Sequence, residues 1–131
     1  MKLITRDTDY AIKAVCYIAK NQNRITSVRG LVKDLKMPRP FLRKILQILH
    51  KRKILNAFKG QGGGFLLAKT ADKIFLVELM EIFQGPLKLN DCIFKKRICS
   101  DRSDCSLKQK IDYIERNVVS ELKSITIASL L

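Results

Sequence analysis

The segment between residues 26 and 65 contains two successive apolar patterns at helical spacing, and this feature restricts the possible folds more than any other. In each pattern, apolar residues recur at i, i+3, i+4 and i+7: first Val28, Leu31, Val32 and Leu35, then Leu42, Ile45, Leu46 and Leu49. Ser27 is a suitable N-cap for the first helix, and Pro38 or Pro40 suits the opening turn of the second, expected over about residues 38–52. Two short amphipathic helices separated by so tight a break predict a helix-turn-helix.

A glycine-rich turn follows the second predicted helix. Residues 54–58 and 65–68 read as short strands, and the turn between them, residues 59–64, holds four glycines. These glycines do not fit a dinucleotide-binding fingerprint, because the third required position falls on Phe65 and no helix begins there. The sequence therefore predicts a winged helix-turn-helix, a mainly α domain with a small β wing.

The second predicted helix turns a polar face away from its leucine stripe. In the major groove, arginine can bind guanine bidentately and glutamine can bind adenine, whereas lysine mainly supplies charge against phosphates. The predicted DNA-binding residues are Arg39, Arg43, Lys44, Gln47 and Lys51 on this helix, with Lys59 and Gln61 on the wing. The alternative is a surface helix pair with a solvated basic face beside a plain hairpin.

The distribution of charge supports a polyanionic partner independently of the helix pattern. Residues 29–59 contain ten Lys and Arg but a single acid, Asp34, which gives this segment +9 of the chain's net +14. Such a concentration is typical of a protein that releases counterions when it binds nucleic acid. Membrane phosphates are the rival polyanion, but an interfacial helix needs exposed apolar residues, and here the apolar stripes are needed inside.

A length of 131 residues suits one domain, or one domain plus an assembly element. Residues 7–20 predict a first helix packed behind the recognition helices, and residues 74–83 predict a later one closed by Gly85-Pro86. We therefore expect a winged helix-turn-helix domain over 1–86, a cysteine loop over 87–106, and a dimerisation helix with a C-terminal segment over 107–131.

The composition also favours some classes of protein over others. The start lacks the long apolar run of a signal peptide, and no uncharged apolar stretch is long enough to span a bilayer, so we expect a cytoplasmic protein without a membrane partner. An enzyme is not expected, because the chain has one histidine, no HExxH-type helix and no phosphate-binding loop.

From residue 107 a near-heptad apolar stripe begins, formed by Leu107, Ile111, Ile114, Val118, Leu122 and Ile125. So long a helix has more apolar surface than a small domain can cover. We expect it to pair with the same helix of a second copy, and the C-terminal segment to pack on the partner. Two-fold symmetry then places the recognition helices roughly 34 Å apart, which predicts a pseudo-palindromic duplex operator. A role in the chain's own core is the alternative.

Residues 90–106 form a polar segment that carries Cys92, Cys99 and Cys105 among charged side chains. Thiolates are soft ligands for iron-sulfur clusters or zinc, and neighbouring cations lower thiol pKa values. Zinc sites usually contain ligand pairs two to four residues apart, which this segment lacks. The spacing favours a metal centre, while a thiol redox switch and incidental cysteines remain alternatives. Cys16, in the first helix, is expected to be a small core residue.

Taken together, these motifs resemble those of a bacterial family of winged helix-turn-helix repressors that includes the iron-sulfur cluster assembly regulator (IscR) and the nitric-oxide-sensitive repressor (NsrR). The resemblance covers nearly the whole chain. Besides the three loop cysteines, it rests on Met1-Lys2-Leu3, Thr8-Asp9-Tyr10-Ala11, Phe41-Leu42 with Ile45-Leu46, Gly60-Gln61-Gly62-Gly63-Gly64-Phe65-Leu66-Leu67, Gly85-Pro86 and Ile125-Thr126-Ile127-Ala128-Ser129-Leu130-Leu131.

The resemblance implies a homodimeric transcriptional regulator whose operator affinity depends on an iron-sulfur cluster, either 2Fe-2S or 4Fe-4S, that senses redox state, nitric oxide or iron status. It implies that Cys92, Cys99 and Cys105 are ligands, and that Asp9 of the partner chain is the fourth, as in the family's nitric-oxide sensors. The assembly regulators have a histidine three residues after the last cysteine, where this chain has Lys108. A cluster-free thiol-redox repressor of the same fold is the alternative function.

Overall fold

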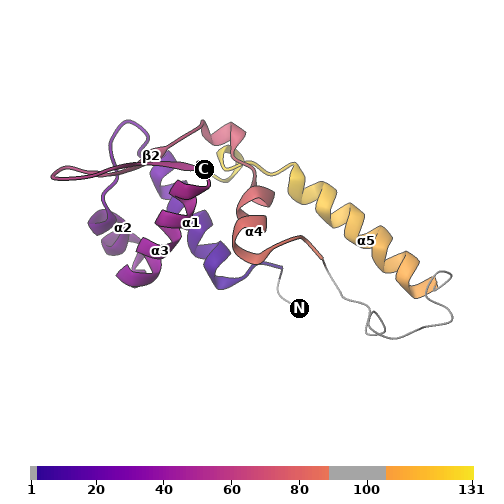
Figure 1. Ribbon diagram of the computed structural model, residues 1–131. Helices are drawn as coiled ribbons and strands as arrows, with labels where there is room; N and C mark the ends of the chain where they lie inside the picture. Colours follow the sequence, from indigo (N-terminus) through magenta and orange to yellow (C-terminus); the bar gives the residue numbers. More distant parts are fainter. Residues whose placement is uncertain (1–2, 89–105) are drawn as a thin grey trace.

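The computed structural model describes residues 3–88 and 106–131. Figure 1 shows a body made of α1 to α4 and a β-hairpin, from which the last long helix, α5, extends to one side. The order of elements is that of a winged helix-turn-helix followed by a long helix, so the fold class predicted from the sequence is confirmed.

Helix α1 (Arg6–Lys20) forms the centre of the body. The Thr5 side chain caps its start by accepting a hydrogen bond from the Thr8 amide, and acidic residues in the first turn suit the positive end of the helix dipole. Ala11, Ala14 and Ile18 are fully buried in the main core, which also contains Leu31 and Leu42 from the next two helices. Small residues at two of these positions allow the neighbouring helices to approach closely.

The predicted helix-turn-helix consists of α2 (Val28–Leu35) and α3 (Arg39–Lys51). The Ser27 side chain caps α2 by accepting a hydrogen bond from the Gly30 amide at 3.0 Å, as its N-cap position predicts. Lys36 ends α2 in the left-handed conformation (φ 53°), and the Met37 side chain beyond it is buried. Pro38 then precedes α3, so the chain turns within three residues, 36–38.

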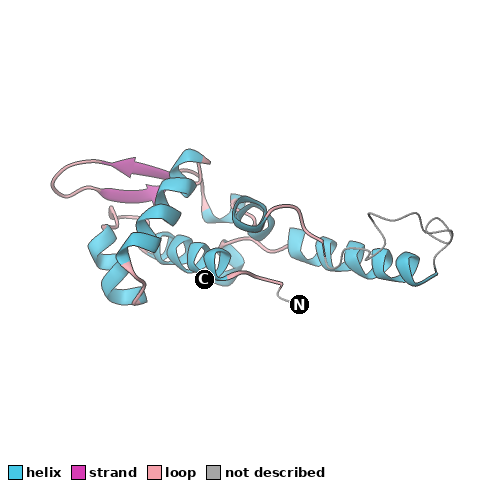
Figure 2. Cartoon of the chain, turned by 60° about the horizontal axis from the view of Figure 1, so that its bottom comes forward, coloured by secondary structure: helices cyan, strands magenta, loops and turns pink. Residues whose placement is uncertain are grey.

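The wing is an antiparallel hairpin of β1 (Leu55–Phe58) and β2 (Gly64–Leu67), which protrudes beyond the helices in Figure 2. Besides β1, strand β2 has a second partner that the sequence pattern did not indicate. Thr26 pairs with Phe65 through two backbone hydrogen bonds, of 3.0 and 2.8 Å. The residue that precedes the α2 cap is therefore joined to the wing, which links the two parts of the candidate interface.

After the wing come the short 3-10 helix η1 (Ala71–Lys73) and helix α4 (Leu76–Gln84). The bidentate ion pair between Lys69 and Glu78 (2.9 and 3.1 Å) joins the base of the wing to α4. Helix α4 buries Leu79 in the main core and Met80 toward α5, so it lies between the body and the long helix.

Helix α5 (Ser106–Lys123) packs on the body through its middle and its C-terminal end. Leu122 is buried beside Met80, and Glu115 and Val118 line a cavity with Gln84 of α4. The N-terminal end of α5 projects away from the body in both views (Figures 1 and 2). There, Leu107 is 69% exposed and Ile114 is 49% exposed. The predicted apolar stripe is therefore covered at one end and open at the other, and its pairing with a second copy remains a prediction.

The C-terminal segment after α5, which ends with the 3-10 helix η2 (Ala128–Leu130), contacts its own domain rather than extending away from it. Thr126 bridges to Phe75, the Ile127 amide donates to the Ile74 carbonyl at 2.8 Å, and the Ile127 side chain is fully buried in the main core. These contacts lie within one chain, and the expected packing of the segment on a partner stays a prediction. The contacts form because residues 74–75 are extended and offer backbone groups that the segment can pair.

Candidate nucleic-acid interface

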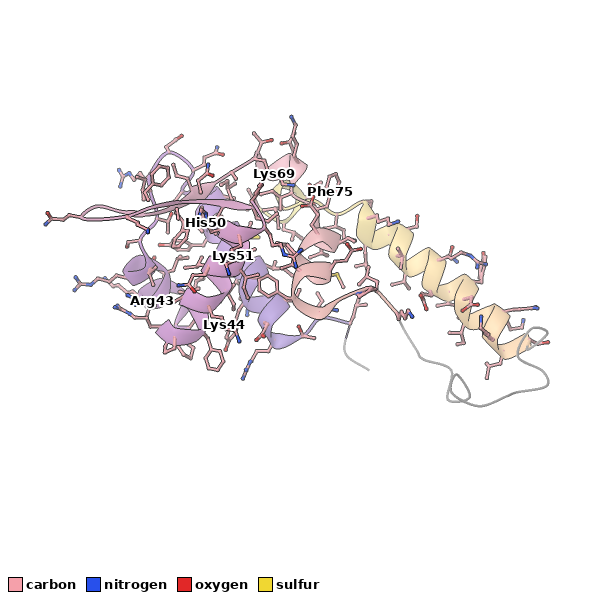
Figure 3. All side chains as sticks on the ribbon, viewed as in Figure 1. Arg43, Lys44, His50, Lys51, Lys69 and Phe75 are labelled. Carbon is pink, nitrogen blue, oxygen red and sulfur yellow. The ribbon has the colours of Figure 1, made fainter. Side chains whose placement is uncertain are left out.

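The candidate interface centres on the face of α3 opposite its buried leucine stripe. Pro40, Lys44, Gln47 and Lys51 lie at i, i+4, i+7 and i+11 and so follow one line along this face. Figure 3 shows Arg43, Lys44 and Lys51 spaced along α3. All the side chains predicted on this helix, Arg39 included, are exposed because Leu42, Ile45, Leu46 and Leu49 occupy the buried side.

Within residues 3–88 and 106–131, the cations of this face form no ion pair with a carboxylate. In the part of the chain that the structure describes, the ion pairs join Arg6 to Asp7, Asp9 to Lys13, Lys69 to Glu78 and Lys108 to Asp112. None of them involves a cation of residues 29–59. Asp34, the one acid of that segment, instead accepts a hydrogen bond from the Tyr17 hydroxyl, which raises the pKa of Tyr17. The basic face thus keeps its charge available for an external anion.

The wing brings Lys59 and Gln61 to the same side of the molecule. Lys59 follows β1 directly and shares a shallow pocket of about 430 Å³ with Gln47 and His50 of α3. Gln61 lies in the exposed turn, where Gly60 and Gly62 adopt positive φ angles of 91° and 78°. The fold therefore brings Gln47 of α3 and Lys59 of the wing to one pocket, with Gln61 beyond it on the turn. The other predicted residues of α3 are exposed outside this pocket.

His50 is a further member of this surface; its place on the recognition helix predicts a side chain that is exposed or faces a phosphate. Its Nδ1 lies 3.2 Å from the Leu55 carbonyl oxygen, so the ring is held against the start of the wing. In the tautomer with a proton on Nδ1, that nitrogen donates to the carbonyl and Nε2 is a hydrogen-bond acceptor. Its position three residues after Gln47, one helical turn along the same face, was the signal that could have identified it.

The three predicted cysteine ligands, Cys92, Cys99 and Cys105, lie outside the described residues. Asp9, the predicted ligand from a partner chain, is in the first turn of α1 with 46% of its side chain exposed. One of its carboxylate oxygens lies 2.8 Å from the Lys13 ammonium, and this hydrogen bond raises the pKa of Lys13. Because both partners are exposed, the pair is weak and does not prevent the carboxylate from meeting another group.

Gln84, the last residue of α4, connects that helix to the start of α1. Its side-chain oxygen accepts hydrogen bonds from the Thr5 amide (3.1 Å) and the Thr8 hydroxyl (2.8 Å), and its amide nitrogen donates to the Leu3 carbonyl (2.9 Å). Beside it, Lys88 and Glu115 of α5 line a cavity of about 230 Å³. The start of α1, the end of α4 and the middle of α5 therefore meet where the chain enters the cysteine segment.

Cys16 is half-buried on α1 and packs against the main core, in keeping with the structural role expected for it. Burial raises the pKa of its thiol, which keeps it protonated and poorly nucleophilic. Over residues 3–88 and 106–131, no three side chains of the metal-ligating types converge. Over the same residues, no helix is both long and apolar enough to cross a bilayer.

A helix-turn-helix with a basic recognition face and a wing defines the class of winged helix-turn-helix transcriptional regulators. Comparison with protein-family models identifies the family within this class. The model of the Rrf2 family, described as an iron-dependent transcriptional regulator, matches residues 4–131, so the chain belongs to the Rrf2 family. The resemblance inferred from the sequence motifs is therefore confirmed.

Individual relatives agree with this assignment. The chain is 35% identical over 124 residues to a protein of Aquifex aeolicus (strain VF5) named as an HTH-type transcriptional regulator, an alignment that covers 93% of this chain and 86% of the relative. Its fold is similar to that of CymR, the global cysteine regulator of B. subtilis, with a TM-score of 0.82, 18% identity and coverage of 99% and 96%. It is also similar to T. potens IscR, with a TM-score of 0.75, 18% identity and coverage of 99% and 85%.

Proposed function

We propose that this regulator acts as a homodimer that binds a pseudo-palindromic duplex operator with α3 in the major groove and the wing beside it. The observation that carries the proposal is the exposed basic face of α3 and the wing, which has no carboxylate partner within the described residues. Lys44 and Lys51 supply phosphate contacts, while Arg43 and Gln47 have the donor and acceptor geometry to bind base edges.

Dimerisation is supported by the open end of α5. Leu107, Tyr113 and Ile114 expose 69%, 60% and 49% of their surfaces on a helix that the body does not cover. A second copy of the same helix would bury them and place two recognition helices about one duplex turn, roughly 34 Å, apart.

We further propose that Cys92, Cys99 and Cys105 hold an iron-sulfur cluster, with Asp9 of the partner chain as the fourth ligand. The donor set fits such a group, because three thiolates and one accessible carboxylate can complete four positions. The family model's description as iron-dependent also supports it. A cluster supplies an oxidation state and a ligand set that change with redox conditions, nitric oxide or iron supply.

The residues on either side of the cysteine loop indicate how a change in the loop could alter DNA binding. Ser106 begins α5 directly after Cys105, so binding of a cluster by Cys105 would act directly on the first turn of this helix. At the other end of the loop, Gln84 holds α4 to the start of α1 through Thr5 and Thr8. We infer that rearrangement of the loop alters the angle of α5 and thereby the separation of the two recognition helices, to which operator affinity is sensitive.

The test of DNA binding is selection of duplexes from a random pool by anaerobically purified protein, followed by fluorescence anisotropy on the selected duplex. We expect an enriched sequence with two inverted half-sites. Binding that is equal for selected and random duplexes would contradict the proposal. Repeating the titration after a chelator has removed the cluster tests whether the cluster controls operator affinity. Equal affinities with and without the cluster would show that the cysteine loop has no regulatory role.

The fourth ligand has its own test. Asp9→Ala should remove or destabilise the visible absorption of the anaerobically purified protein. Asp7→Ala is the matched control, because Asp7 shares the first turn and its helix-dipole stabilisation but is not a proposed ligand. An Asp9→Ala spectrum with wild-type intensity and lifetime would exclude Asp9.

A cluster-free thiol-redox repressor is the second candidate. Lys108, an amine that does not suit a cluster, stands where the assembly regulators have a histidine, and a similar fold is found in an oxidised form of Staphylococcus aureus CymR (TM-score 0.75, 16% identity). This function predicts colourless, iron-free protein after anaerobic purification. It also predicts a disulfide between two loop cysteines after oxidation, which peptide mass spectrometry would detect.

A further inference from the structure

Arg6 and Phe41 form a contact that links the start of α1 to the recognition helix. The central carbon of the Arg6 guanidinium lies 4.9 Å from the centroid of the Phe41 ring. Phe41 is 43% exposed in the first turn of α3, and the Arg6 side chain is 65% exposed. A guanidinium is attracted to the face of an aromatic ring at this distance, so Phe41 restricts the positions that Arg6 can occupy at the protein surface.

This contact lies on the flank of α3 that faces away from the wing. His50 lines the pocket that α3 shares with Lys59 and other wing residues, so its side of the helix faces the wing. Phe41 and His50 are nine positions apart, which at roughly 100° per residue places them on opposite sides of the helix axis. Arg6 therefore adds a cation to the side of α3 opposite the wing.

A helix in the major groove meets phosphates on both flanks, because the groove is only about 12 Å wide between its two strands. On the wing side, Lys59 is available for a phosphate. On the far flank, Lys44 lies on the exposed face of α3, and Arg6, over the Phe41 ring, lies farther from the wing than Lys44. Among the residues that the structure describes, the carboxylate paired with Arg6 is that of Asp7, with Nε to Oδ1 at 3.9 Å, and both side chains are more than half exposed. Such a pair is weak in water, so it does not compete strongly with a phosphate.

We propose that Arg6 is a phosphate-binding residue that contacts the DNA strand on the far side of α3 from the wing, and that Phe41 positions it. A guanidinium resting on a ring keeps its N–H groups in the plane of the fork, free to bind a phosphate bidentately. The proposal rests on DNA binding through α3. It extends the interface to an element outside the helix-turn-helix and the wing.

The test measures how the affinity of the wild-type and variant proteins for the duplex selected by the wild-type protein depends on salt concentration. Each protomer of the dimer should lose one phosphate contact, so the slope of log K against log salt should fall by about 1.8 in total. The affinity deficit of Arg6→Ala should then shrink by about 12-fold between 50 and 200 mM salt. Lys73→Ala is the matched control, because it removes the same charge from η1, outside α3 and the wing, and its slope should equal that of the wild type.

The role of the ring is tested by a double-mutant cycle. Phe41→Leu keeps apolar volume but removes the ring face, so it should weaken binding in the wild-type background and have little further effect in Arg6→Ala. Arg6→Gln, which keeps most of the side-chain length, replaces Arg6→Ala if circular dichroism shows that the alanine variant does not fold. A wild-type slope in the Arg6 variant, or additive effects in the cycle, would overturn the proposal. Failure of the wild-type protein to select any duplex would instead overturn the proposed DNA binding.

Discussion

Asp34 is the one carboxylate between residues 29 and 59, and its hydrogen-bond partner is a phenol rather than a cation. The Tyr17 hydroxyl thus ties α1 to α2 without neutralising any residue of the basic face. At the scale of single residues, the candidate interface depends on this separation. Its cations point to solvent, while the acids of the body pair with cations outside residues 29–59, such as Lys13 and Lys69.

The Tyr17 bond predicts a pH-dependent contribution to stability. Because the folded protein raises the pKa of Tyr17 above its usual value near 10, the contribution is fully present below pH 10 and is lost as the pH rises through the folded value. Tyr17→Phe should lower the free energy of unfolding by about 0.5–1 kcal/mol at pH 7, a modest value because the bond is exposed. In urea titrations, the difference should disappear above the folded pKa. A difference unchanged in strongly alkaline buffer would contradict this account.

Arg43 and Lys59 should have different effects on DNA binding. Lys59→Ala should remove one phosphate contact from each protomer, so it should weaken binding to all sequences and lower the salt slope by about one per protomer. Arg43→Ala removes a bidentate base contact, so it should cost about 1–3 kcal/mol on the selected duplex and relax base preference at one position. Anisotropy titrations against a panel of single-base variants separate the two. Equal losses across the panel for both variants would show that Arg43 contacts only the backbone.

At the scale of elements, the two parts of the interface are held together by the backbone pairing of Thr26 with Phe65. This pairing requires very close approach at the neighbouring residue. A Cβ atom on Gly64 would lie 2.2 Å from the Thr26 carbonyl oxygen, well inside contact distance. The position of the wing relative to α2 therefore depends on the bridge between Thr26 and Phe65 as well as on the hairpin itself.

Gly64→Ala should consequently destabilise the wing. Moving the Thr26 backbone aside should cost about 1–3 kcal/mol of unfolding free energy, with weaker DNA binding because Lys59 loses its position. Gly62→Asn is the control: this glycine has a positive φ of 78°, which asparagine tolerates, and nothing lies near its Cβ position. Thermal and urea unfolding measure both variants. Equal stabilities for the two would show that Thr26 is not a rigid neighbour.

Ile127 provides a second prediction at this scale, since it anchors the C-terminal segment in the main core. Its side chain is fully buried, so Ile127→Ala should lower the free energy of unfolding by about 2–5 kcal/mol. Leu130→Ala, which shortens a side chain that is 45% exposed in the same segment, should change it by less than about 0.5 kcal/mol. Similar losses in urea titrations would mean that the segment does not depend on Ile127.

At the scale of the whole molecule, the chain divides into a packed body and a helix that is largely uncovered. Helix α5 is attached through Leu122, α4 and the C-terminal segment, while its N-terminal half exposes large apolar side chains. Exposed apolar surface of this kind usually marks an interface. The body covers the middle and C-terminal end of α5 and leaves the large apolar side chains of its first turns exposed, so we expect a change near Ser106 to alter the direction of that end of the helix.

The dimer proposal predicts the effect of charge on this surface. Leu107→Asp together with Ile114→Asp should convert the protein to a monomer and strongly weaken operator binding, because one recognition helix then binds alone. Leu131→Asp, which places the same charge on a leucine that is 51% exposed outside α5, is the control. Sedimentation velocity at micromolar concentration measures the oligomeric state of each variant. A monomeric wild-type protein would contradict the proposal.

Sequence alone determined the helix-turn-helix, the wing and the basic face of α3, because each depends on residues close together in the chain. Helical spacing of leucines sets which side of α3 is buried, and so which side exposes Lys44 and Gln47. The four glycines of residues 59–64 identified the turn of the wing in the same way. The three cysteine ligands, by contrast, remain a prediction from sequence and resemblance.

Only the tertiary structure decided the pairing of Thr26 with Phe65, the return of Ile127 to its own core and the contact of Arg6 with Phe41. The first two use backbone N–H and C=O groups, which nearly every residue possesses, so no residue pattern records which distant segments pair. The third joins side chains from two helices whose relative placement depends on how α1 packs behind α3. Local periodicity specifies each helix face, but the meeting of two faces follows from packing of the whole chain.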